Sequence, residues 1–176
     1  PTQLADAFAR CASEALGAFG SGALYVEKRV CRARHIEVQV LGDGSGAVSH
    51  LWERDCSLQR RHQKLVEIAP SPDLDASTRD AIIASALRLA AEVRYLGIGT
   101  FEFLLDLDQP GHFYFMEANP RVQVEHTVTE QVTGIDLLHS QLHLAAGASL
   151  ADLGLLTPPA TNGYAVQVRL NLESLH

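Results

Sequence analysis

The chain has 176 residues, of which 47% are hydrophobic and 20% charged, which is ordinary for one globular domain with a core of its own. Its net charge of −7 argues against nucleic acid as the main partner, because nucleic-acid binding favours a basic face. Three scattered cysteines predict neither a disulfide framework nor a zinc site and favour a reducing compartment. Because no apolar run has transmembrane length and no signal-peptide pattern occurs, we expect a cytoplasmic protein without a membrane partner.

The first half of the chain predicts a helix and then strands. Apolar residues at helical spacing predict a helix over 2–19, which the sequence GSG ends. Strict alternation over 35–41 places Ile36, Val38 and Val40 on one face of a strand and polar residues on the other. The sequence GDGSG then predicts a turn. Strands are expected at 23–30, at 35–41, at 47–54 as a hairpin partner, and late in 59–70.

The second half predicts a long helix followed by a hairpin and shorter helices. Asp75, Ser77 or Thr78 would cap a helix that Gly97 ends. The elements expected after it are strands at 100–107 and 113–118, helices at 127–133 and 135–146, a linker at 157–163, and a last strand at 164–172. Strands and helices in mixed order, with hairpins, predict an α+β fold.

Two glutamates interrupt the apolar strands of the second hairpin. If Glu102 lies opposite Glu117, the turn centres on Gln109 and Pro110, which suits a turn because proline cannot donate to a ladder. Two neighbouring buried carboxylates repel each other, so a cation should lie between them. Oxygen ligands with Asn119 nearby favour magnesium or manganese. The alternative is that both glutamates lie on the wet face of an edge hairpin.

Polar residues alternate with valines after Asn119. An extended segment would place Arg121, Gln123 and Glu125 on one side, close to the carboxylate hairpin. Arginine suits a small planar oxyanion such as bicarbonate, and Glu125 could serve as a general base toward it. The alternative is an ordinary polar strand edge with a weak Arg–Glu pair.

Basic residues gather within 53–64 of an otherwise acidic chain: Arg54, Arg60, Arg61, His62 and Lys64. This cluster would hold nucleotide phosphates or the anion. Its alternative is a solvated charged run, which is the commoner fate of such clusters.

Several long strings now resemble a known family in their order along the chain. They are YVEKRV, RHIEVQVLGDGSGAV, ERDCSLQRRHQKLVEIAPSP, LGIGTFEFLLD and FYFMEANPRVQVEHTVTEQVTGIDLL. The chain resembles, over about residues 2–173, the biotin carboxylase family of ATP-grasp ligases. The resemblance implies an incomplete ATP-grasp-type antiparallel sheet with packed helices over 1–158. Residues 159–176 would then be the first strand of the C-terminal subdomain.

The resemblance also implies a reaction and its partners. Members of the family use MgATP to phosphorylate bicarbonate to carboxyphosphate, and then carboxylate biotin held on a carrier domain. A carboxyltransferase domain or subunit and a homodimer are further expected partners. The cofactors implied are ATP, Mg²⁺ or Mn²⁺, and carrier-bound biotin.

The resemblance also implies roles for the residues of this sequence that match the family's motifs. The metal ligands would be Glu102, Glu117 and Asn119. Arg121, Gln123, Val124 and Lys64 would hold bicarbonate, Glu125 would deprotonate it, and Arg169 would stabilise the biotin enolate. The nucleotide would contact Glu27, Lys28, Arg29 and Val30 at the adenine, and His35, Gln59 and His62 elsewhere.

The sequence departs from the family in three respects. The upstream half of the family pattern, with its glycine-rich lid and phosphate-contacting lysines, has no counterpart in these residues, and much of the C-terminal subdomain is missing too. GDGSG is not that lid, because it lies between two hairpin strands and does not open a helix. Gln167 stands where many relatives have glutamate, and this favours members fused into multi-domain carboxylases. We therefore expect a fragment of a larger enzyme that cannot turn over ATP alone.

Two other functions remain open. A carbamoyl phosphate synthetase-type ligase also makes carboxyphosphate but passes it to ammonia. A non-catalytic nucleotide-binding module is the second, although the intact carboxylates and Arg121 argue against it.

Overall fold

A computed structural model describes residues 2–170 and divides the chain into two compact units, Pro1–Val30 and Cys31–His176. The first unit contains helix α1 (Thr2–Phe19), as predicted. The helix ends where Gly20, with a φ of +72°, donates its amide to the carbonyl of Leu16 at 3.0 Å. The strand predicted at 23–30 is wrong: this segment is neither helix nor strand, because the described part of the unit offers no second strand to pair with it.

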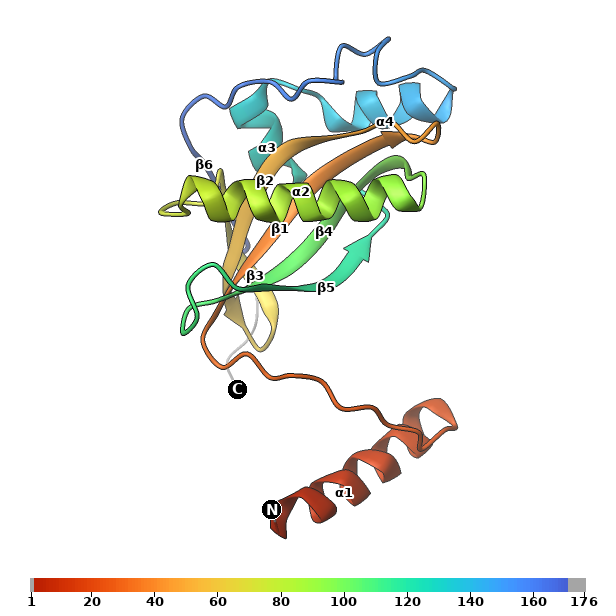
Figure 1. The fold of residues 1–176 in the computed structure, drawn as a ribbon, viewed down its shortest axis with the longest axis vertical. Helices are drawn as coiled ribbons and strands as arrows, with labels where there is room; N and C mark the ends of the chain where they lie inside the picture. Colours follow the sequence, from red (N-terminus) through yellow and green to blue (C-terminus); the bar gives the residue numbers. More distant parts are fainter. Residues whose placement is uncertain (1, 171–176) are drawn as a thin grey trace. The chain divides into compact units, whose positions relative to one another are not determined.

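The second unit is built on one antiparallel sheet of six strands (Figure 1). The strand order is β5-β4-β1-β2-β3-β6, so β5 and β6 form the two edges. The α+β class and the antiparallel sheet predicted from the sequence are confirmed. The bounds are β1 (Ala33–Asp43), β2 (Val48–Arg60), β3 (Gln63–Ala69), β4 (Leu96–Asp106), β5 (Phe113–Asn119) and β6 (Ala165–Val168).

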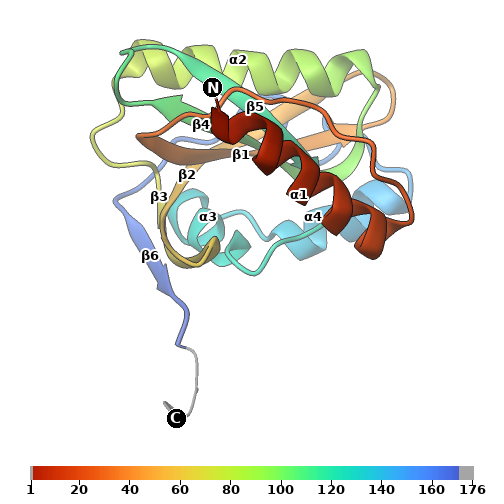
Figure 2. The same ribbon diagram turned by 90° about the horizontal axis from the view of Figure 1, so that it is seen from below.

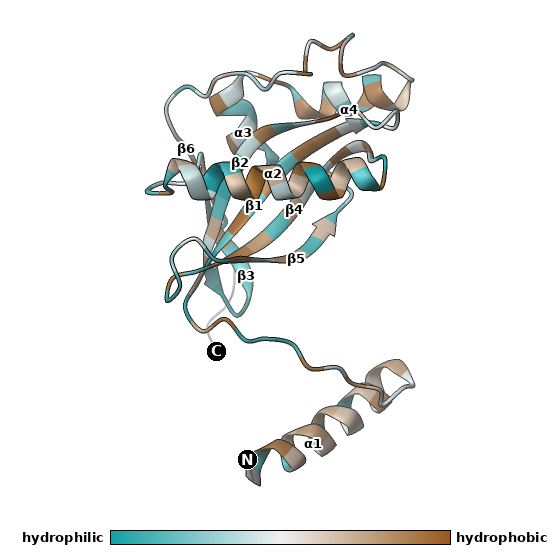
Figure 3. Cartoon of the chain, in the orientation of Figure 1, coloured by the Kyte–Doolittle hydropathy of each residue, from teal (hydrophilic) through white to brown (hydrophobic). Residues whose placement is uncertain are grey.

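Helices cover both faces of this sheet, as Figure 2 shows. Helix α2 (Ala76–Glu92) packs on one face through a core that includes Ile36 and Val38 of β1. Helices α3 (His126–Thr133) and α4 (Leu137–Ala145) lie on the opposite face. The alternation predicted for β1 is confirmed, because its apolar residues face α2 while its polar residues face α3. Hydrophobic and hydrophilic stretches both occur along the central strands (Figure 3).

Helix α2 begins as predicted and ends differently. The carboxylate of Asp75 accepts from the amide of Thr78 at 2.8 Å and caps the first turn. At the other end, Arg94 takes a left-handed conformation with a φ of +48°, and the amide of Tyr95 donates to the carbonyl of Ala90. This is a Schellman motif with arginine in the usual glycine position. The prediction that Gly97 ends the helix is therefore wrong: Gly97 lies within β4.

The last described strand, β6, joins the same sheet by pairing with β3. Trp52 of β2 anchors the linker that leads to it, since its Nε1 donates to the carbonyl of Pro159 at 2.7 Å. Residues 171–172 of the predicted strand lie outside the described residues. The domain boundary near residue 158 stays a prediction.

Candidate active site

A row of charged residues crosses four neighbouring strands at one level of the sheet. Arg54 of β2 is paired with Glu37 of β1, Glu37 with Glu102 of β4, and Glu102 with Glu117 of β5. The predicted pairing of Glu102 with Glu117 in a hairpin is therefore confirmed. Neighbouring strands lie about 4.8 Å apart, so the row concentrates charge that must be balanced locally.

The amide of Asn119 lies between the two carboxylates of the hairpin. Its Nδ2 donates to Oε1 of Glu102 at 2.9 Å and to Oε1 of Glu117 at 3.0 Å. Both carboxylates thus open toward the same side of the sheet. Glu102 is buried, whereas Glu117 is exposed and accessible to a ligand.

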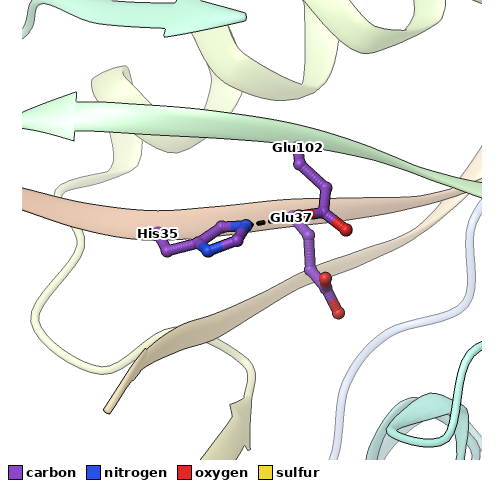
Figure 4. Close-up of side chains that lie close together, drawn as sticks. All are labelled: His35, Glu37 and Glu102. Atoms are coloured by element: carbon purple, nitrogen blue, oxygen red, sulfur yellow. Dashed lines mark hydrogen bonds and ion pairs between the residues drawn. The ribbon is translucent and has the colours of Figure 1, made fainter. Parts of the chain in front are cut away.

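His35 holds the second oxygen of Glu102. Gln59 donates from Nε2 to the carbonyl of Cys56 at 2.9 Å, and this contact turns the nitrogen side of its amide toward Nδ1 of His35 at 2.8 Å. Because Nδ1 accepts this hydrogen bond, the ring proton belongs on Nε2. Nε2 then donates to Oε2 of Glu102 at 2.5 Å (Figure 4).

Lys64 of β3 places its ammonium group among three carboxylates. Its Nζ lies 2.5 Å from Glu37, 3.1 Å from Glu102 and 3.0 Å from Glu125. The side chain of Lys64 is only 14% exposed, so water screens these ion pairs weakly. Lys64 therefore balances part of the negative charge of all three buried carboxylates.

The pKa values around Lys64 follow from this arrangement. Burial would raise the pKa of Glu102 and of Glu125, but Lys64 and the hydrogen bonds to these carboxylates hold both pKa values below the ordinary range. Burial would lower the pKa of Lys64, but Glu37 and Glu102 raise it. All three groups are therefore charged at neutral pH.

Glu125, just before α3, bridges two cations. Its Oε1 contacts Lys64, and its Oε2 accepts from Nη2 of Arg169 at 2.7 Å. Nε of Arg169 lies 2.7 Å from the buried carboxylate of Glu67. The strand β6 thus brings Arg169 to the residue predicted as general base.

The segment after β5 is not the extended run that alternation predicted. The amide of Arg121 donates to the carbonyl of Asn119 at 2.8 Å, which makes a tight turn. Gln123 and Glu125 are buried, as the alternation suggests, but Val124 points outward and is exposed. The turn follows from Pro120, which has no amide hydrogen to continue the ladder.

Arg54 is neither solvent-exposed nor a phosphate contact, contrary to both interpretations of the basic cluster. It is 0% exposed, and its Nε donates to Glu37 at 2.5 Å. Its Nη1 donates to Gln39 and to Thr129 of α3, each at 2.8 Å. Two buried glutamates that contact site residues, Glu37 and Glu67, were not predicted from the sequence. The polar face of the strand at 35–41 could have indicated Glu37.

A tight turn carries His62. Arg61 and His62 connect β2 to β3 with φ values of +51° and +64°, as in a type I′ hairpin. Positive φ values are uncommon for residues other than glycine, asparagine and aspartate. The turn places His62 so that it lines the same cavity as Gln59.

A cavity of about 590 Å³ collects these side chains. Twelve predicted site residues line it: His35, Gln59, His62, Lys64, Glu102, Glu117, Asn119, Arg121, Gln123, Val124, Glu125 and Arg169. The predicted adenine contacts Glu27, Lys28, Arg29 and Val30 belong to the first unit, and that assignment stays a prediction.

The donor set of the hairpin fits a hard divalent ion. Two carboxylates converge there without a thiolate, and the Nδ2 group of Asn119 holds them together. Mg²⁺ and Mn²⁺ prefer carboxylate oxygens as ligands. His35 orients Glu102 from behind, as outer partners of metal ligands commonly do.

Among the described residues, no helix is long and apolar enough to cross a membrane.

Comparisons with known proteins agree with this geometry. A family model described as "Carbamoyl-phosphate synthase L chain, ATP binding domain" matches residues 1–153. Pyruvate carboxylase of Aspergillus niger is 54% identical over 172 residues, and human mitochondrial pyruvate carboxylase is 52% identical. Each match covers 97% of this chain and 14% of the relative, so the chain spans about one seventh of their length.

Solved structures show the same fold. The Campylobacter jejuni biotin carboxylase, in a complex described as "beta-gamma-ATP", matches with a TM-score of 0.84 and 44% identity over 96% of this chain and 36% of that one. Rhizobium etli pyruvate carboxylase matches with a TM-score of 0.83 and 48% identity over 93% of this chain and 15% of that one. The chain therefore belongs to the carbamoyl-phosphate synthase L chain, ATP binding domain family, and its predicted homology to biotin carboxylases is confirmed.

Proposed function

We propose that this chain is the metal- and bicarbonate-binding part of a biotin carboxylase. The whole enzyme would use MgATP to turn bicarbonate into carboxyphosphate and then carboxylate biotin on a carrier domain. The observation that carries the proposal is the convergence of Glu102, Glu117 and Asn119 beside Lys64 and Glu125 in one cavity.

The residues of the cavity supply an anion site. Arg121 and Lys64 would attract bicarbonate, and Gln123 and Val124, which line the same cavity, would help to hold it. Glu125 would take the proton of bicarbonate, because it is an ionised carboxylate that lines the same cavity. Arg169, which already contacts Glu125, would stabilise the negative charge that develops on biotin.

Glu102, Glu117 and Asn119 would hold Mg²⁺ or Mn²⁺. When bound, the ion would neutralise charge on the nucleotide phosphates. His35, Gln59 and His62 would lie around the nucleotide, and Glu27, Lys28, Arg29 and Val30 would contact the adenine.

The proposal also covers the partner domains, the oligomeric state and the cellular location of the whole protein. The whole protein would be fused to, or associated with, a biotinyl carrier and a carboxyltransferase. The descriptions of two matched structures as a multifunctional pyruvate carboxylase and as a domain of a single-chain bacterial carboxylase support this. The description of the Hydrogenobacter thermophilus biotin carboxylase domain as a dimer supports a homodimer. A cytoplasmic location is proposed from the sequence alone, and the human and rat relatives are named mitochondrial.

The name of the matched family favours one alternative, a ligase of the carbamoyl phosphate synthetase type. The identity of 44% or more to proteins described as biotin carboxylases or pyruvate carboxylases favours biotin as the acceptor.

The test measures ATP hydrolysis by the intact protein with bicarbonate, and then adds free biotin or ammonium. We expect bicarbonate-dependent hydrolysis that biotin stimulates and ammonium does not. Stimulation by ammonium alone would favour the carbamoyl phosphate synthetase type. A correctly folded protein that binds ATP without hydrolysing it would favour a non-catalytic module.

A further inference from the structure

Helix α4 carries two exposed histidines one turn apart, on the solvent side of the second unit. Residues four apart share one face of a helix, so His139 and His143 are neighbours. Their Nε2 atoms lie 3.1 Å apart, and their ring centroids lie 4.3 Å apart. Neither ring lines the cavity described above, and the proposed carboxylation does not use them.

The separation of the two nitrogens suits a shared metal ion. Zinc–imidazole bonds are about 2.0–2.1 Å long, so two nitrogens on one ion lie roughly 2.9–3.4 Å apart for bond angles between a right angle and a tetrahedral one. The observed 3.1 Å falls inside that interval. The two rings are hydrogen-bonded to each other at this distance, so a bound ion would replace that hydrogen bond. Both rings are exposed, which leaves them room to rotate toward the ion.

The backbone beneath the two rings is fixed before any ion binds. Leu137 and Leu144 are buried in a core cluster with Leu41 and Ile98, which holds α4 against the sheet. Asp136 caps the helix by accepting from the amide of His139 at 2.7 Å. A chelating pair on a rigid element binds better than the same residues on a mobile loop, because less conformational entropy is lost.

We propose that His139 and His143 form a surface binding site for a divalent transition-metal ion such as Zn²⁺, Cu²⁺ or Ni²⁺. These ions suit imidazole ligands, whereas Mg²⁺ prefers oxygen. Two protein ligands leave the remaining coordination positions to water, so the site is a weaker one than a closed structural zinc site. A bound ion would link two turns of α4 and stabilise the folded state by mass action.

The test measures Cu²⁺ binding to the intact protein in excess Mg²⁺, by electron paramagnetic resonance and by titration. His139→Asn and His143→Asn each remove one ligand, and His112→Asn removes an exposed histidine that lies in the β4–β5 turn. We expect each of the first two substitutions to weaken one binding site on the order of a hundredfold, because the advantage of two linked ligands is lost. His112→Asn should leave that site unchanged.

Acidification provides a second readout. Binding at this site should weaken on acidification, since protons compete with the metal ion for the ligand nitrogens. Loss of the site in His139→Asn and His143→Asn, with unchanged bicarbonate-dependent ATP hydrolysis, would support the proposal independently of the carboxylase function. Wild-type affinity in either variant, or an equal loss in His112→Asn, would overturn it.

Discussion

Lys64 has the most consequential position of any single residue in the site. Its ammonium group balances Glu37, Glu102 and Glu125, which would otherwise repel one another in a poorly solvated space. An anion that enters the cavity would therefore meet a cation already held in place. Lys64 thus links the stability of the sheet to the binding site.

We predict that Lys64→Met lowers the free energy of unfolding by about 3–5 kcal/mol at neutral pH, because it removes the cation that three buried carboxylates share and leaves each of them with one partner fewer. The deficit should shrink as the pH falls below about 4.5. In the wild type, the lowered pKa values of Glu102 and Glu125 provide stability above that pH, which is lost as these groups protonate in the folded state. Urea unfolding of the chain at several pH values measures both effects.

The control is Arg88→Met, which removes an exposed cation that contacts Ser85 on α2. Its effect should stay within about 0.5 kcal/mol, as for most surface substitutions. A deficit of Lys64→Met that is small, or independent of pH, would contradict the balancing role.

Pairings within one hairpin could be predicted from the sequence, whereas contacts between distant elements could not. Glu102 and Glu117 could be aligned because hairpin register follows from a short turn. Arg54 could not be placed, since its partner Glu37 and its contact Thr129 lie on elements 17 and 75 residues away along the chain. Burial of a charge depends on such distant partners, and composition does not reveal them.

Close backbone packing at Gly99 determines where β5 lies beside β4. A Cβ at Gly99 would lie 2.1 Å from Oη of Tyr95 and 2.6 Å from the carbonyl oxygen of Asn119. Tyr95 also donates to the carbonyl of Ile98 at 3.0 Å, so its ring is not free to move away. Any side chain at this position would displace the strand that carries two proposed metal ligands.

We predict that Gly99→Ala lowers the free energy of unfolding by about 1–3 kcal/mol through overpacking. In the intact protein it should also reduce bicarbonate-dependent ATP hydrolysis, because Asn119 must shift. Gly17→Ala is the control: a Cβ there meets nothing within 4 Å, and it should be neutral or stabilise α1 by about 0.5–1 kcal/mol. Equal stability and activity for Gly99→Ala and the wild type would contradict this account of β4 and β5.

Most elements could be predicted from local pattern, and the failures have physical causes. The alternation of β1 and the Asp75 cap of α2 are local signals, and both are present in the structure. Residues 23–30 have strand-like composition but no partner strand in the described part of their unit. Gly97 has the left-handed conformation expected of a helix-ending glycine, but Arg94 ends α2 three residues earlier.

At the scale of the whole molecule, the chain corresponds to part of its longer relatives. It spans 14% of the curated pyruvate carboxylases and 36% of the Campylobacter jejuni biotin carboxylase. The antiparallel sheet collects the proposed metal, anion and base residues around one cavity. The proposed catalysis is therefore tested in the intact protein.

The most direct test compares Glu117→Gln with Glu92→Gln in the intact protein. Glu117 is exposed beside the cavity, so glutamine keeps its shape and removes one proposed ligand charge, whereas Glu92 is an exposed glutamate at the end of α2. We predict that Glu117→Gln reduces bicarbonate-dependent ATP hydrolysis more than about 100-fold at saturating Mg²⁺, since even the outer partners of metal ligands are worth about 10–100-fold. Glu92→Gln should retain wild-type activity. A folded Glu117→Gln variant with wild-type activity and Mg²⁺ dependence would contradict the proposed site.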